Sequence, residues 1–136
     1  MQTERTPVSK FFAPCTVLVV DDEPAVRLSL KSILEERFTV ITCADGPEAI
    51  KFASEHAGEI YVALVDYAMR PMDGRLVCSA LRTLDATISL IGFSGNEDAP
   101  FQAPLFATLL KKNLCPEQVV ALVTSAIRCS EQLRSR

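Results

Sequence analysis

This 136-residue sequence has no apolar stretch long enough to cross a membrane. The longest apolar run, from Ile60 to Val65, is far shorter than the roughly 20 residues that a transmembrane helix needs. The N-terminal segment MQTERTPVSKFFAPC lacks the apolar centre of a secretory signal peptide. We therefore expect a soluble, cytoplasmic protein without a membrane partner.

The sequence also lacks paired cysteines and an excess of positive charge. None of its five cysteines forms a C-x-x-C pair, and their odd number and wide spacing are typical of reduced thiols that pack as small apolar residues. The net charge of −3 gives no electrostatic basis for direct nucleic-acid binding by this segment. With 49% hydrophobic residues and no internal repeat, the chain is expected to fold as one domain.

Short branched apolar runs alternate with segments whose apolar residues recur at helical spacing. Strands are expected at 16–20, 38–43, 60–65, 88–93 and, with a weaker pattern, 106–110. Helices are expected to begin near Pro24, Pro47 and Pro116, with a further helix after the loop 67–72. This alternation predicts an α/β fold, a doubly wound, five-stranded parallel sheet in a flavodoxin-like three-layer sandwich, with strand order 2-1-3-4-5.

The domain boundaries follow from the polar ends of the chain. We interpret residues 1–14 as a flexible N-terminal extension, 15–128 as the folded domain, and 129–136 as a C-terminal tail or the start of a linker. Only 17 residues, two of them prolines, separate Ser94 from Lys112. The fourth helix is therefore expected to be short, irregular or missing.

Polar residues stand at the ends of four of the expected strands. Asp21 and Asp22 follow the first strand, Asp66 the third, Ser94 the fourth, and the pair Lys111-Lys112 the fifth. In an open parallel sheet, sites form beyond the carboxyl ends of the strands. If the first and third strands are neighbours, the three carboxylates converge at one edge.

Three converging carboxylates repel one another unless a cation offsets their charge. Oxygen ligands with room for water suit Mg²⁺, which needs only one or two carboxylates. A carboxylate beside such an ion can attack phosphorus and form an acyl phosphate. Phosphoryl transfer then depends mainly on charge neutralisation and positioning, which a lysine and a hydroxyl can provide.

Four segments, VLVVDDEP, LVDYAMRPMDG, GFSG and LLKKN, resemble the signature stretches of response-regulator receiver domains. The resemblance covers about residues 15–128 in order and spacing. It implies that Asp66 is the phosphoacceptor and that Asp21 and Asp22 form the acidic pair, with Asp22 a direct metal ligand. Asp66 and the backbone carbonyl of Ala68 would complete the protein's share of a Mg²⁺ (or Mn²⁺) site.

The resemblance also assigns two residues to the phosphoryl group. Ser94 would be the hydroxyl switch residue, and Lys112 would pair with the phosphoryl oxygens. Lys112 is preferred to Lys111 because of its place before Asn113 and because of strand alternation. Read without the resemblance, Asp22 suits a helix N-cap and Ser94 suits a turn.

The sequence departs from the family pattern at three further positions. Arg70, followed by Pro71, replaces the proline usually found four residues after the acceptor. Asn113 replaces the proline usually found after the lysine, and Leu109 replaces a frequent aromatic residue. These departures affect the usual output mechanism more than the site chemistry.

The resemblance implies a sensor histidine kinase or phosphotransfer protein as donor, and an unknown output domain or downstream protein. Such a domain catalyses only its own phosphorylation and dephosphorylation, and is otherwise not an enzyme. Two alternatives stay open: a degenerate receiver that acts as an unphosphorylated interaction module, and a Mg²⁺-dependent phosphatase with an aspartate nucleophile. A flavin binder is disfavoured, because the acidic segment Asp21-Asp22-Glu23 would repel a phosphate.

Overall fold

The computed structural model describes residues 15–96, 99–101 and 104–135. Its strands and helices alternate along the chain in the order β1 (Thr16–Val20), α2 (Pro24–Leu34), β2 (Thr39–Cys43), α3 (Gly46–Glu55), β3 (Ile60–Asp66), α4 (Gly74–Leu84), β4 (Ser89–Ser94), β5 (Ala107–Leu110), a 3-10 turn (Lys111–Asn113) and α5 (Pro116–Arg134). The strands form one parallel sheet with the order β2-β1-β3-β4-β5. The predicted fold class and strand order are confirmed.

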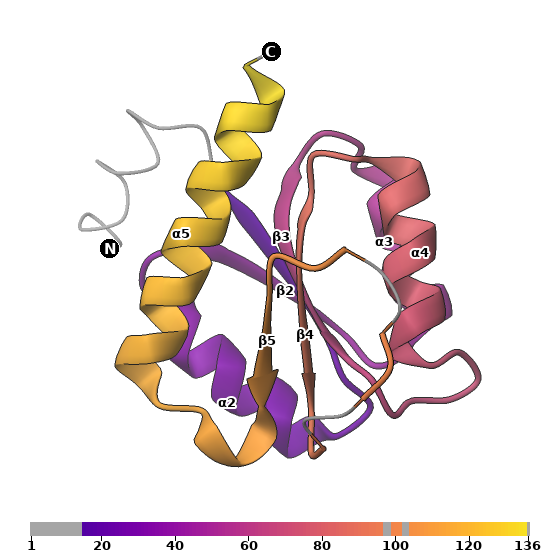
Figure 1. Cartoon of the computed structure of the whole chain (residues 1–136), viewed down its shortest axis with the longest axis vertical. Helices are drawn as coiled ribbons and strands as arrows, with labels where there is room; N and C mark the ends of the chain where they lie inside the picture. Colours follow the sequence, from indigo (N-terminus) through magenta and orange to yellow (C-terminus); the bar gives the residue numbers. More distant parts are fainter. Residues whose placement is uncertain (1–14, 97–98, 102–103, 136) are drawn as a thin grey trace, which may run out of the picture.

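The sheet separates two layers of helices. Helices α3 and α4 cover one face, and α2 and α5 cover the other (Figure 1). Because both faces are covered, β1 and β4 are buried along their whole length. Each face has its own apolar cluster, one built around Leu18, Val65 and Leu81 and the other around Val19, Leu64 and Val123.

Aspartates fix the starts of two helices on the first of these faces. Asp45 accepts a hydrogen bond from the backbone N–H of Glu48 at 2.9 Å, and Asp73 accepts one from Leu76 at 3.1 Å. Each bond satisfies a donor that the first turn of a helix otherwise leaves without a partner. Asp45 and Asp73 are therefore the N-caps of α3 and α4.

The connection from β4 to β5 contains no helix among its described residues, 95–96, 99–101 and 104–106. The side chain of Phe101, only 5% exposed, packs instead on the face of the sheet that α3 and α4 cover. Its ring meets Tyr67 edge-on, with the ring centroids 5.3 Å apart. One aromatic side chain therefore covers part of the surface that a fourth helix would bury.

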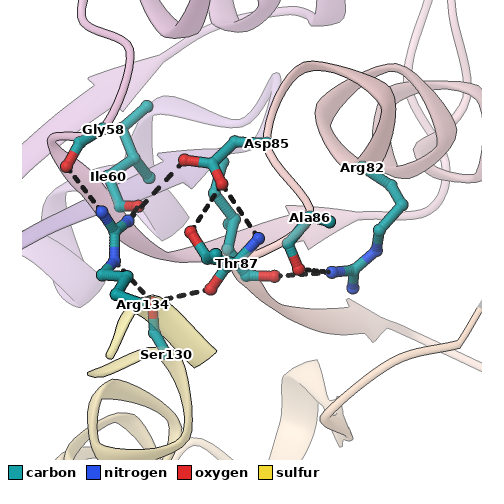
Figure 2. Close-up of polar contacts among 9 residues, drawn as sticks. Gly58, Ile60, Arg82, Asp85, Ala86, Thr87, Ser130 and Arg134 are labelled. Carbon is teal, nitrogen blue, oxygen red and sulfur yellow. Dashed lines mark hydrogen bonds and ion pairs between the residues drawn. The ribbon is translucent and has the colours of Figure 1, made fainter. Parts of the chain in front are cut away.

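The last helix, α5, extends into the residues that were expected to form a C-terminal tail. Helix α5 continues unbroken through residues 129–134, for which the sequence predicts a tail or the start of a linker. Ser130 is buried and donates a hydrogen bond to the carbonyl of Thr87 at 2.7 Å. Arg134 donates to the carbonyls of Gly58 and Ile60 (Figure 2). Its guanidinium also lies 4.0 Å from the ring centroid of Tyr61. These contacts anchor the end of α5 to the edge of the sheet opposite the carboxylates.

Three other expectations concern the ends and the loops of the chain. The expected N-terminal extension, residues 1–14, lies outside the described residues. Among the helices that are described, none has the length and apolar character needed to cross a membrane. The unusual loop after β3 contains a cis peptide bond between Arg70 and Pro71.

Candidate functional site

The three aspartates converge at the carboxyl edge of the sheet. Val20 of β1 pairs with Val65 of β3, so the residues that follow them, Asp21 and Asp66, lie side by side. Both side chains are buried, with exposed fractions of 0% and 1%, whereas Asp22 is exposed. One carboxylate oxygen from each of the three residues lies within 4.8 Å of the others. The convergence predicted from the sequence is present in the structure.

Three of the four oxygens of the buried Asp21 and Asp66 carboxylates are without a hydrogen bond. Asp21 Oδ2 and both carboxylate oxygens of Asp66 accept none from the described residues. Burial, together with the neighbouring charge of Asp21, raises the pKa of Asp66 to about 6. Burial also raises the pKa of Asp21. A cation at this point would offset the repulsion and use the unsatisfied oxygens.

Lys111, the neighbour of the expected Lys112, is the lysine that reaches these carboxylates in the structure. The ammonium of Lys111 lies 3.1 Å from Asp66 Oδ2 and 3.2 Å from Asp21 Oδ2, whereas Lys112 is exposed. Strand β5 ends at Leu110 and a 3-10 turn starts at Lys111, so the alternation of the strand does not extend to Lys112. Burial opposes the charge of Lys111, but three carboxylates, among them Asp66 and Asp21, together raise its pKa.

Ser94 ends β4, as predicted, and its hydroxyl forms a local turn. The hydroxyl donates to the backbone carbonyl of Asn96 and accepts from the backbone N–H of the same residue at 3.1 Å. The turn interpretation of Ser94 is therefore confirmed. A contact between Ser94 and a phosphoryl group would require this hydroxyl to exchange its donor bond with Asn96.

Two neighbours of the acidic pair, Glu23 and Arg27, were given no site role in the sequence analysis. The N-cap of α2 is Glu23, without a side-chain cap, so Asp22 does not serve as the helix cap. Asp21 Oδ1 instead accepts from the Glu23 N–H at 2.8 Å, and Arg27 donates to the Asp21 carbonyl at 2.6 Å. The position of Arg27 one helical turn after Glu23 was the available signal. These bonds fix the backbone that carries the acidic pair.

The donor set fits a hard divalent cation. All the candidate side-chain ligands are carboxylate oxygens, which is the chemistry that Mg²⁺ and Mn²⁺ share. The exposed Asp22 leaves one side of the cluster open to water, and Mg²⁺ usually keeps several waters. Ala68 lies two residues beyond Asp66 in the loop between β3 and α4, where its carbonyl is a further candidate ligand.

Comparison with known proteins agrees with this geometry. The sequence profile of the response regulator receiver domain matches residues 17–124. The chain is 31% identical over 121 residues to the alkaline phosphatase synthesis transcriptional regulatory protein PhoP of Bacillus subtilis, covering 85% of this chain and 49% of that protein. It is 37% identical over 87 residues to the sensor kinase CckA of Brucella abortus, covering 63% of this chain and 9% of that protein.

Solved structures show the same fold. The receiver domain of the hybrid histidine kinase CckA superposes with a TM-score of 0.72 at 28% identity, covering 82% of this chain and 98% of that one. A receiver domain protein from Clostridium thermocellum superposes with a TM-score of 0.79 at 21% identity, covering 88% and 98%. The chain spans less than half the length of the curated relatives described above. The fold, the acidic edge and the sequence profile agree: this chain belongs to the response regulator receiver domain family of two-component systems.

Proposed function

We propose that this receiver accepts a phosphoryl group on Asp66, with a Mg²⁺ (or Mn²⁺) ion held by Asp21, Asp22, Asp66 and the carbonyl of Ala68. The observation that carries the proposal is a buried carboxylate, Asp66, whose oxygens accept no hydrogen bond among the described residues and lie beside two further aspartates and a lysine. A buried carboxylate whose oxygens accept no hydrogen bond is costly, so a chain that keeps one has a use for it.

The reaction assigns a distinct role to each residue. An oxygen of ionised Asp66 attacks phosphorus, and the bond from phosphorus to the histidine nitrogen of the donor breaks as the acyl phosphate forms. With a pKa of about 6, Asp66 is mostly ionised at neutral pH. Lys111 neutralises charge on the phosphoryl oxygens, in the role that we first expected for Lys112. A bound divalent ion supplies further charge neutralisation and orients the phosphoryl group.

Partners follow from the family and from the names of the relatives. A sensor kinase and a transcriptional regulatory protein are among the proteins that this chain resembles. We propose that a sensor histidine kinase or phosphotransfer protein donates the phosphoryl group, and that an output domain or downstream protein reads the result. The chain catalyses its own phosphorylation and dephosphorylation and turns over no external substrate.

Phosphorylation by a small-molecule donor tests this function. Incubation with acetyl phosphate and Mg²⁺ is expected to add one phosphoryl group, observed by intact-protein mass spectrometry. Asp66→Asn and chelation of the metal should each abolish the addition, whereas Asp73→Asn, which alters a helix cap outside the site, should not. Metal-dependent phosphorylation that persists in Asp66→Asn would refute the assignment. A wild-type chain that is never phosphorylated would favour the unphosphorylated interaction module.

A further inference from the structure

Three carboxylates share the ammonium of Lys111, and the shortest contact is with the one outside the metal cluster. Glu23 Oε1 accepts a hydrogen bond from Lys111 Nζ at 2.7 Å. The contacts with Asp66 and Asp21 are longer, at 3.1 and 3.2 Å. Glu23 is exposed and is not one of the three converging aspartates. The best-formed bond of Lys111 is therefore with a residue at the rim of the site.

Lys111 contacts two of the carboxyl groups that would hold a divalent ion. Lys111 contacts Asp21 Oδ2 and Asp66 Oδ2, and these carboxyl groups also belong to the metal cluster. Two cations a few ångströms apart repel each other, and a partly buried position screens them less than bulk water does. An ion held by Asp21 and Asp66 would therefore weaken the contacts that Lys111 makes with these two carboxylates.

Glu23 can hold the ammonium of Lys111 by an ion pair outside the aspartate cluster. Its backbone is held where the carboxylate can meet the lysine, because its N–H donates to Asp21 Oδ1 at 2.8 Å and Pro24 follows as the first residue of α2. An ammonium that kept Glu23 alone would remain next to Asp66 without occupying the oxygens of the aspartates. The Glu23–Lys111 pair differs from an ordinary surface ion pair because its lysine also contacts Asp21 and Asp66.

We propose that Glu23 is a positioning residue that retains Lys111 at the rim of the site while Asp21 and Asp66 hold the divalent cation. The same lysine then stands ready for the phosphoryl group on Asp66. This inference rests on the proposed function, since it concerns the lysine of the same site. It assigns a role to the third acidic residue after β1, outside the aspartate pair.

A double-mutant cycle on metal binding tests this role in the unphosphorylated protein. Mg²⁺ is titrated at constant ionic strength into the wild type, Glu23→Gln, Lys111→Met and the double variant, and amide chemical shifts give the dissociation constant. We expect Glu23→Gln to weaken binding about three- to tenfold, a typical size of coupling between neighbouring charges, because Lys111 then competes fully for Asp21 and Asp66. Lys111→Met should tighten binding, and adding Glu23→Gln to it should change nothing further.

Controls separate positioning from simpler effects. Glu36→Gln removes one exposed negative charge after the far end of α2 and should leave the affinity unchanged. Glu23→Asp keeps the charge and should recover part of the wild-type affinity. Equal weakening by Glu23→Gln with and without Lys111 would mean that Glu23 acts on the ion directly, and the proposal would fail. No effect in either background would reduce the contact to a surface ion pair.

Failure of this inference is distinguishable from failure of the proposed function. If the wild type binds Mg²⁺ and is phosphorylated but the cycle shows no coupling, the role of Glu23 is refuted and that of Asp66 stands. If the wild type neither binds Mg²⁺ nor accepts a phosphoryl group, both are refuted. The melting temperatures of all four proteins identify any variant whose affinity changes because the fold is lost.

Discussion

The ring of Phe101 lies directly against the backbone of Gly92 in β4. A Cβ atom on Gly92 would stand 2.6 Å from two carbons of this ring, which is closer than real contacts allow. The glycine therefore makes room for the aromatic side chain that comes from the connection between β4 and β5. Sequence and packing are matched at this point: a small residue in the strand and a large one in the loop above it.

Gly92→Ala is expected to destabilise the fold by about 1–3 kcal/mol, because a methyl group there overpacks a filled space. Gly95→Ala is the matched control, since a Cβ at Gly95 would have no neighbour within 4 Å. Urea unfolding of both variants measures the difference. In the presence of Phe101→Leu, the cost of Gly92→Ala should fall. An equal cost for Gly92→Ala and Gly95→Ala would show that Phe101 does not occupy this position.

The buried charge of Asp66 makes stability depend on pH in the metal-free protein. The pKa of this carboxyl is about 6 in the folded state, above its ordinary value of 3.8. Between these two values the folded chain binds more protons than the unfolded chain, so stability falls as the pH rises from about 4 to about 6. Above that range the charged form remains a constant cost of order 1–3 kcal/mol.

Asp66→Asn removes this cost and is expected to raise the free energy of unfolding at pH 8 by that order. The gain should shrink as the pH falls toward 4, because protonated Asp66 carries no charge either. Denaturant unfolding at several pH values without metal measures both effects, with the exposed Glu36→Gln as a control for the loss of one charge. A variant that is less stable than the wild type at pH 8 would contradict the prediction.

The sequence predicts the carboxylate edge well because parallel strands end at the same edge of their sheet. Once the order β2-β1-β3-β4-β5 is expected, Asp21 and Asp66 must lie together, and no detail of side-chain packing is needed. The same reasoning places Ser94 at the end of β4. It does not show that the Ser94 hydroxyl bonds to the backbone of Asn96, which depends on the conformation of the following turn.

Two expectations extended a sequence pattern beyond the strand or helix in which it holds. Strand alternation favoured Lys112, but β5 stops at Leu110, and the 3-10 turn that follows brings Lys111 to the carboxylates. The polar residues after 128 suggested a tail, because their partners are far away in the chain. Arg134 bonds to carbonyls 76 and 74 residues before it, and this separation leaves no local signal.

The end of α5 should therefore contribute to stability. Arg134→Ala removes the hydrogen bonds to Gly58 and Ile60 and the contact with Tyr61, and is expected to cost about 1–3 kcal/mol. Arg128→Ala is the matched control, because Arg128 is exposed on the same helix. Thermal or urea unfolding distinguishes the two. Equal stability of both variants would restore the interpretation of these residues as a tail.

The two adjacent lysines give the sharpest test of the site. Lys111 lies 3.1 Å from Asp66 Oδ2, and Lys112 is exposed, so only the first is placed to neutralise a phosphoryl group on Asp66. Lys111→Met is expected to slow phosphorylation by acetyl phosphate at saturating Mg²⁺ by about 10- to 100-fold, toward the size reported for loss of one electrostatic contact in a transition state. Lys112→Met should retain the wild-type rate.

The same comparison distinguishes chemistry from folding. Both lysine variants keep a side chain of similar length, and their melting temperatures show whether either loses the fold. If Lys112→Met slows phosphorylation and Lys111→Met does not, the lysine before Asn113 is the functional one, and the 3-10 turn must rearrange to bring it to Asp66. If only Lys111→Met slows phosphorylation, Lys111 is the lysine that neutralises the phosphoryl group. Its side chain already reaches Asp21 and Asp66, so the 3-10 turn need not rearrange.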